Sequence, residues 1–238
     1  MAQLFVTCLV DMFTPHVGEA VVDLLEGLDV PVEFPEDQTC CGQPAFNTGF
    51  HREARRMAVH TVRVLDETEG PIIVPSGSCA DMIIHHIPEL VADDPQLHEA
   101  AERVAARTRE LTTFLVDDLG FGNVGATGEG TCTLHHSCHG LRNLGIKGQP
   151  EHLVDSIEGL QRVELEDATE CCGFGGLFAI EMPDVSAAML AKKLDAIEAT
   201  GADVVVGGDV SCLMHIAGGL HRRGSTVEAR HIAELLDS

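Results

Sequence analysis

The sequence predicts an α/β protein made of two pseudo-repeated halves, each a small parallel sheet flanked by helices. Short apolar runs alternate with segments of helical length in the order strand–helix–strand–helix–strand, once in each half. The cysteines repeat as well, because eight of the nine form two matching sets with nearly equal internal spacing. These sets are Cys8, Cys40, Cys41 and Cys79, and then Cys138, Cys171, Cys172 and Cys212. We interpret the chain as an internal duplication in which the thiols are the repeated feature.

The first half is expected to hold three strands and two helices. Residues 16–28 carry apolar side chains on one face at helical spacing, and Gly70 and Pro71 terminate a second helical segment at 50–67. The short apolar runs between these segments predict strands. The expected strands are residues 4–10, 31–34 and 72–74.

A helical connection and a glycine-rich stretch separate the halves. Residues 80–119 have a helical pattern that is interrupted at Pro88 and Pro95. Residues 120–130 contain five glycines in eleven positions, which is typical of a linker. We therefore expect a first repeat with its helical connection at 1–125 and a second repeat at 126–238.

The second half repeats the order of the first. Pro183 and Asp184 begin its longest helix, and Gly201 ends that helix. The expected strands are residues 131–136, 163–165 and 204–206. The expected helices are residues 152–160, 183–200, a segment from Cys212 to about Gly224, and 231–236.

The repeated cysteines lie just after strands, at the edge of a parallel sheet where open α/β folds bind their ligands. Four thiolates from three loops suit an iron–sulfur cluster, because such clusters take soft sulfur donors. Gly42 and Gly173 directly follow the cysteine pairs and allow the backbone to approach a bulky ligand. The ninth cysteine, Cys132, lies within a strand and has no counterpart in the first half, so we assign it to the core.

Other uses of the repeated thiols are open at this point. Free cysteine often packs as a small hydrophobic residue, although packing alone does not require thiols at matched positions. Zinc can bind four thiolates in a closed structural site, although the short Cys-x-x-Cys spacing of many zinc sites is absent. A vicinal disulfide within either cysteine pair would be strained and would leave the outer cysteines unexplained.

The segment from His135 to His139 resembles a metal-binding motif. Side chains alternate between the faces of a strand, so His135 and His136 cannot both reach one site. We expect His139 to form a hydrogen bond to the bound group rather than to coordinate it. The sequence offers no evident acid–base catalyst, and catalytic residues stay unassigned.

Composition limits the partners and the location. The chain has 15 basic and 38 acidic side chains and a formal net charge of −23, which argues against binding to nucleic acid. No apolar run approaches the roughly 18 residues of a membrane span. The N-terminal segment lacks the basic region and cleavage site of a signal peptide. These features favour a cytoplasmic protein whose cysteines are metal ligands or redox thiols.

The cysteine spacing Cys-x31-Cys-Cys-x37-Cys recurs as Cys-x32-Cys-Cys-x39-Cys, with glycine after each pair. This double pattern resembles the cysteine-rich CCG domain of iron–sulfur proteins, and the similarity covers nearly the whole chain. Residues 137–142, 170–176 and 208–216 are most similar to the lactate-utilisation branch of that family. The resemblance implies that the eight cysteines bind one or two iron–sulfur clusters per chain, of the 4Fe-4S type.

The resemblance also implies an electron-transfer subunit, an oxidoreductase component, in a multi-protein complex that oxidises L-lactate to pyruvate. The implied partners are other subunits of that complex, including a second iron–sulfur protein. The alternatives are a disulfide or thiol reductase subunit of the heterodisulfide reductase type and a zinc-stabilised scaffold subunit.

The chain departs from the heterodisulfide reductase pattern at Ser76 and Asp209, where that pattern has the first cysteine of Cys-x-x-Cys. The departure favours an ordinary four-thiolate cluster, or one with an open iron. We expect both residues to cap the helices that carry Cys79 and Cys212.

Overall fold

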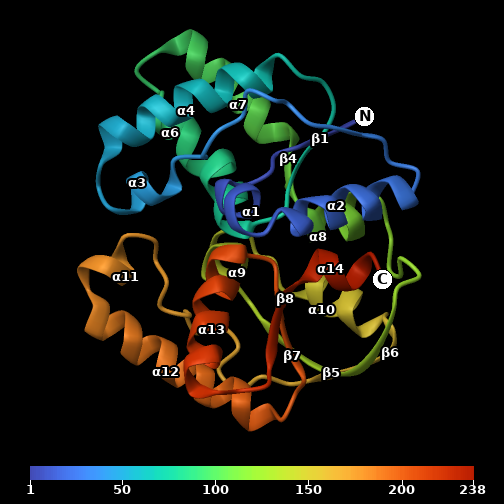
Figure 1. The fold of residues 1–238 in the computed structure, drawn as a ribbon. Coiled ribbons are helices and arrows are strands. Elements are labelled where there is room, and N and C mark those ends of the chain that lie inside the picture. The colour runs from blue at the N-terminus through green and yellow to red at the C-terminus, as the bar shows by residue number, and fades with distance from the viewer. The chain divides into compact units, whose positions relative to one another are not determined.

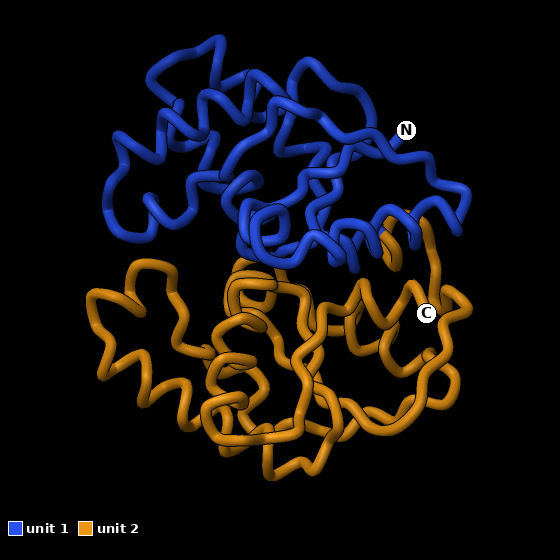
Figure 2. Tube along the Cα trace, in the orientation of Figure 1, with its two compact units in different colours: residues 1–114 blue, residues 115–238 orange.

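The computed structural model describes residues 1–238 (Figure 1). The chain forms two compact units, Met1–Phe114 and Leu115–Ser238, which Figure 2 colours separately. Each unit contains a four-stranded parallel sheet, with the strand order β2-β1-β3-β4 in unit 1 and β6-β5-β7-β8 in unit 2. The two sheets therefore have the same topology, and the predicted duplication of an α/β fold is confirmed.

The two central strands of unit 1 are buried on both faces, as is usual in parallel sheets. All three residues of the central strand β3 are fully buried. The strands of this unit are β1 Ala2–Leu4, β2 Val32–Glu33, β3 Ile72–Val74 and β4 Thr108–Glu110. Its helices are α1 Cys8–Phe13, α2 Pro15–Gly27, α3 Gln43–Asn47, α4 His51–Asp66, α5 Gly77–Asp81, α6 Ile87–Leu90, α7 Pro95–Arg107 and α8 Leu111–Thr113, with a π-helical segment η1 at Met82–His86.

Unit 2 follows the same plan. Its strands are β5 Thr127–His135, β6 Glu158–Val163, β7 Val204–Gly207 and β8 Glu228–His231. Its helices are α9 Cys138–Asn143, α10 Gly148–Asp155, α11 Phe178–Glu181, α12 Pro183–Thr200, α13 Val210–Arg223 and α14 Ile232–Leu236. A second π-helical segment, η2 Phe114–Asp118, contains the last residue of unit 1 and the first residues of unit 2.

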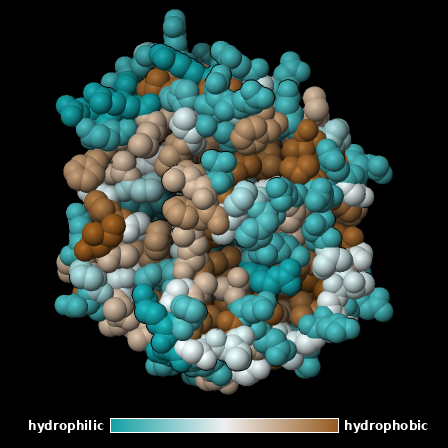
Figure 3. All heavy atoms as spheres, in the orientation of Figure 1, coloured by the Kyte–Doolittle hydropathy of each residue, from teal (hydrophilic) through white to brown (hydrophobic).

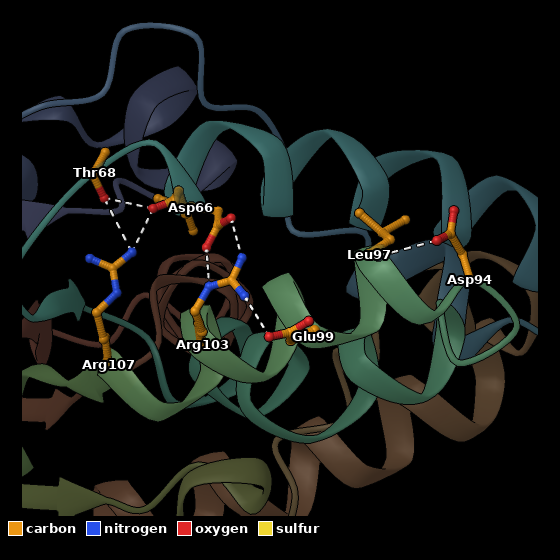
Figure 4. Close-up of polar contacts among 8 residues, drawn as sticks. Asp66, Thr68, Asp94, Leu97, Glu99, Arg103 and Arg107 are labelled. Atoms are coloured by element: carbon orange, nitrogen blue, oxygen red, sulfur yellow. Dashed lines mark hydrogen bonds and ion pairs between the residues drawn. The ribbon is translucent and has the colours of Figure 1, made fainter.

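Polar contacts join α4 and α7 on the outside of unit 1 (Figure 4). Arg103 of α7 donates two hydrogen bonds, of 3.0 and 2.7 Å, to the carboxylate of Asp66 in α4. Glu99, one turn earlier in α7, lies 3.6 Å from the same guanidinium. Arg103 is about half exposed, so this contact orients the two helices and contributes little to stability. Hydrophilic side chains cover most of the helices at the top of the view in Figure 3, which belong to unit 1.

Two edge strands were not expected from the sequence. β4 lies in the stretch 80–119 that the pattern assigned to helix, and β8 ends at His231, the first residue of the expected helix 231–236. Each pairs in parallel with a central strand, β4 with β3 and β8 with β7. Their sequences, Thr-Arg-Glu and Glu-Ala-Arg-His, carry no apolar run, so pairing with the neighbouring strand rather than local pattern determines their conformation.

Three expected element boundaries were wrong by five residues or more. The first strand ends at Leu4 rather than at residue 10, because Thr7 caps a helix that begins at Cys8. In unit 2, α10 ends at Asp155, whereas the pattern extended this helix to residue 160. β6 then occupies residues 158–163, earlier than the expected strand at 163–165, because these residues pair with β5.

The structure divides between residues 114 and 115, compared with the expected boundary between 125 and 126. A polar contact joins residues 115–125 to the rest of unit 2, because the Gln149 side chain of α10 donates to the Asp117 carboxylate at 2.7 Å. None of the helices combines the length and the apolar character that crossing a membrane requires.

Candidate metal centres

In unit 1 the four repeated cysteines come together from three segments. Cys8 is the first residue of α1, Cys40 and Cys41 lie in the loop before α3, and Cys79 lies in α5. The Sγ atoms of Cys41 and Cys79 are 3.3 Å apart, and all nine cysteines of the chain are free thiols. The segments that follow β1, β2 and β3 therefore deliver the thiols to one end of the sheet, where β1 and β3 are neighbours.

Unit 2 repeats this arrangement. Cys138 is the first residue of α9, Cys171 and Cys172 lie in the loop that follows β6, and Cys212 lies in the first turn of α13. The backbone N–H of Gly173 donates to Cys171 Sγ at 3.4 Å, and that of Gly42 donates to Cys40 Sγ at 3.5 Å in unit 1. The Sγ atom of Cys138 also lies 3.7 Å from Nδ1 of His139. His139 therefore lies beside a repeated thiol, and its hydrogen bond to a bound group stays a prediction.

The glycines after the cysteine pairs have the same role in both units. Gly42 and Gly173 have φ angles of +92° and +88°, a conformation that other residues rarely adopt. A Cβ atom on Gly173 would lie 2.7 Å from the carbonyl oxygen of Ser186 in α12. On Gly42 it would lie 3.2 Å from Cβ of Met57 in α4. Each cysteine pair is therefore held against the long helix that follows it.

The thiols of each set strongly affect one another's ionisation. Hydrogen bonds from the Cys41 and Cys8 thiols lower the pKa of Cys40 far below its usual range, and the same contacts raise the pKa values of Cys8 and Cys41. In unit 2, hydrogen bonds from Cys138 and Cys172 lower the pKa of Cys171, whereas the pKa values of Cys138 and Cys172 rise. One thiol in each set thus ionises easily. The two thiols of each set whose pKa values rise need a cation beside them to become thiolates, which is the condition that a bound metal provides.

Unit 2 adds a histidine to its thiols. A ring nitrogen of His135 and the Sγ atoms of Cys172 and Cys212 all lie within 4.8 Å of one another. His135 is only 2% exposed, and neither ring nitrogen has a hydrogen-bond partner. Burial lowers the pKa of His135 to about 3, so the ring is neutral. His136 instead lies 3.2 Å from the carboxylate of Glu151, so the two histidines reach different surroundings, as strand alternation predicts.

The sequence did not single out His135 or the buried Lys193 as site residues. Lys193 of α12 is 2% exposed and donates a hydrogen bond of 2.7 Å to the carbonyl oxygen of Asp167. Burial lowers the pKa of Lys193, while the nearby Glu170 and Cys172 partly oppose this shift. The repeat itself contains the signal that could have found both residues, because they differ from their counterparts in the first half.

The capping prediction holds at Ser76 and is wrong at Asp209. Oγ of Ser76 accepts a hydrogen bond of 3.3 Å from the backbone N–H of Cys79 at the start of α5. Asp209 occupies the N-cap position of α13, but its side chain accepts no capping hydrogen bond. Asp209 is 2% exposed, and its charge contributes to the raised pKa of Cys138. Asp209 therefore belongs to the surroundings of the thiols in unit 2.

Cys132 lies apart from the loops that carry the repeated thiols. It is fully buried in the middle of β5, in register with Arg162 of β6 and Val204 of β7. Burial raises the pKa of Cys132 to about 11, so it is a neutral thiol. This environment is that of a core residue.

Two α/β units, each with four converging thiols at one end of a parallel sheet, define a duplicated cysteine-rich protein. The sequence profile of the CCG cysteine-rich domain matches residues 2–84 and 132–217. The chain belongs to this CCG cysteine-rich domain family.

Two relatives named Lactate utilization protein A extend the similarity to nearly the whole chain. The protein from Exiguobacterium sp. is 47% identical over 235 residues, which cover 98% of this chain and 96% of the relative. The protein from Bacillus subtilis is 45% identical over 236 residues, which cover 99% of this chain and 98% of the relative. A hypothetical protein from Helicobacter pylori shares the fold, with a TM-score of 0.69 at 12% identity, and this chain spans 48% of its length.

Proposed function

We propose that the protein is an iron–sulfur electron-transfer subunit of a multi-protein system that oxidises L-lactate to pyruvate. The observation that carries this proposal is the duplicated set of four free thiols that converge from three segments in each unit. The name of the relatives, Lactate utilization protein A, supports lactate as the substrate of the system, because the identity to them extends over nearly the full chain.

The residues that would hold the iron–sulfur groups are the eight repeated cysteines, with one group in each unit. Their chemistry fits the group, because thiolates are the preferred donors for iron–sulfur clusters. A bound 4Fe-4S cluster would supply one-electron redox chemistry. The protein would contribute the thiolates and the backbone N–H groups of Gly42 and Gly173, which already donate to sulfur. Such N–H donors stabilise negative charge on the bound group.

We place the protein in the cytoplasm, where thiols stay reduced. Electron transfer needs a donor and an acceptor, so we propose partner subunits that include a second iron–sulfur protein. The large negative charge of the chain, −23, favours partners with basic surfaces and disfavours nucleic acid.

A zinc-stabilised scaffold subunit is the second candidate. The observation that favours it is the group of His135, Cys172 and Cys212, because mixed nitrogen and sulfur donors are common in zinc sites. A reductase of the heterodisulfide type has less support, because Ser76 and Asp209 stand where a further cysteine of that pattern would lie.

Anaerobic purification followed by iron, sulfide and zinc analysis tests the proposal. We expect a brown protein with broad visible absorbance and with iron and acid-labile sulfide in equal amounts. Cys172→Ser should lose much of this iron, because a serine hydroxyl is a poor donor to iron. Cys132→Ser is the matched control and should keep it. A colourless protein with stoichiometric zinc would contradict electron transfer and support the scaffold function.

A further inference from the structure

The two candidate centres have equivalent backbone positions, but at one of these positions the buried side chain differs between the units. In unit 1 β1 pairs with β3 through Leu4 and Ile73, and in unit 2 β5 pairs with β7 through Leu134 and Val206. The two pairs are equivalent, because in each unit they precede the first and the last repeated cysteine by the same number of positions. At the next position of the first strand, unit 1 has Phe5 and unit 2 has His135. Both side chains are buried, with exposures of 0% and 2%.

The position of His135 is unfavourable for an imidazole that has no ligand. Burying a polar group without a hydrogen bond is destabilising, and both ring nitrogens of His135 lack a partner. Phenylalanine fills the equivalent position of unit 1 without this cost. A ring nitrogen of His135 is also within 4.8 Å of two thiols that belong to the repeated set, Cys172 and Cys212. A metal bound to these thiols would give the imidazole the partner that the protein does not supply.

The long helices that pack against the two cysteine pairs also differ between the units, and unit 2 again has the more polar side chain. Gly42 and Gly173 approach Met57 of α4 and Met189 of α12, so these two methionines are equivalent positions. One turn after them, unit 1 has Thr61 and unit 2 has Lys193, and both side chains are buried.

The segments around the last cysteine of each set show a similar change. Counted from Cys79 and Cys212, His215 in α13 corresponds to Met82, and Asp209 corresponds to Ser76. Unit 2 therefore surrounds its thiols with nitrogen and carboxylate groups where unit 1 has less polar ones.

We propose that His135 is a nitrogen ligand of the metal centre in unit 2, beside Cys172 and Cys212 and in place of one of the four thiolates assigned to that centre above, whereas the centre in unit 1 is held by thiolates alone. The proposal rests on metal binding by the repeated thiols, as proposed above. A neutral imidazole that takes the place of a thiolate lowers the negative charge of an iron–sulfur centre and raises its reduction potential. The two centres of one chain would then differ in potential, and electrons would collect on the centre of unit 2.

Pulsed electron paramagnetic resonance on the reduced, anaerobically purified full chain tests this ligand. The protein is produced with isotopically labelled histidine, so that a nitrogen bound directly to iron is recognised by its strong hyperfine coupling. The residues of unit 1 supply the variants. In His135→Phe, the histidine is replaced by the residue at the equivalent position of unit 1, Phe5. The control is His139→Leu, which also introduces the unit 1 residue, because Leu9 and His139 directly follow the first cysteine of each set.

We expect wild type and His139→Leu to show the strong coupling and His135→Phe to lose it, with the acid-labile sulfide retained. Absence of the coupling in wild type that carries iron overturns the proposal without any variant, even if His135→Phe fails to fold. Retention in His135→Phe, or loss only in His139→Leu, also overturns it.

Metal analysis separates failure of this ligand from failure of the proposed function. If wild type carries zinc instead of iron, electron transfer is contradicted, and X-ray absorption at the zinc edge then tests the same ligand. Zinc–nitrogen scattering that disappears in His135→Phe supports His135 as a ligand, and zinc bound by sulfur alone overturns it. A chain without any metal overturns both proposals.

Discussion

Gly173→Ala tests whether close packing of the cysteine loop on α12 is a structural requirement. The φ angle of Gly173 is +88°, and an added Cβ would approach the carbonyl oxygen of Ser186 to 2.7 Å and Cβ of Met189 to 3.0 Å. Oγ of Ser186 also donates a hydrogen bond of 2.8 Å to the carbonyl oxygen of Gly173. The helix backbone therefore cannot move away without losing this contact.

The expected magnitude has two parts. A left-handed conformation costs a residue with a Cβ about 1–2 kcal/mol relative to glycine. Forcing an extra methyl group against a packed backbone costs typically about 1–3 kcal/mol more. Gly201 isolates the first part, because its φ angle is +67° and a Cβ there would meet nothing within 4 Å. Gly173→Ala should therefore destabilise the protein by about 1–3 kcal/mol more than Gly201→Ala does.

Urea unfolding followed by circular dichroism gives the two free energies of unfolding. The helical signal is the suitable probe, because the chain has neither tryptophan nor tyrosine. An unchanged dependence on urea in both variants is needed to read the midpoints as stability changes. Equal destabilisation by the two substitutions would refute the argument, because it would show that the approach of Gly173 to α12 is not a constraint.

Three further predictions concern single side chains. Ser76→Ala should lower the free energy of unfolding by about 1 kcal/mol, because it removes the cap from α5, and unchanged urea unfolding would contradict this. Cys132→Ser should cost a similar amount, about 1 kcal/mol, while keeping the metal content of wild type, and loss of metal would show that this thiol is a ligand. Hydrogen bonds from Arg162 lower the pKa of Asp155, so the stability they contribute is present above the unfolded pKa of about 4 and is lost as pH falls through the lower folded value. Asp155→Asn should therefore flatten the acid side of the stability profile, by less than about 1 kcal/mol because the carboxylate is 47% exposed, and an unchanged profile would contradict it.

The central strands β3 and β7 could be predicted because their own sequences specify them. Ile72–Val74 and Val204–Gly207 are short, mostly β-branched runs that are buried, as parallel strands covered on both faces usually are. The edge strands β4 and β8 could not be predicted in this way. Thr108 and Glu110 of β4 are polar yet buried, and the hydroxyl of Thr108 donates to the carbonyl oxygen of Val104 at 2.8 Å. The pairing of these edge strands depends on the strands beside them in the folded protein rather than on their own sequence pattern.

The convergence of the thiols was also accessible from the sequence, because residues that follow parallel strands meet at one end of the sheet. The sequence could not show which histidine lies beside the thiols. Alternation showed that His135 and His136 lie on opposite faces, but it could not show which face meets the cysteine loops. The burial of Lys193 was hidden for a similar reason, since a lysine within a helix is usually solvent-exposed.

Comparison of the two units distinguishes the residues that position the thiols from the residues that would set the properties of a bound metal. Thr7 and Ser137 cap the helices that begin at Cys8 and Cys138, and the glycine after each cysteine pair has a left-handed conformation in both units. These features fix where the thiols lie, so both units need them. The buried residues beside the thiols are not needed to position them, and these residues differ between the units. Unit 1 has Phe5 where unit 2 has His135. Since neighbouring groups set the charge and potential of a bound metal, two copies of one scaffold can hold two centres of unequal properties.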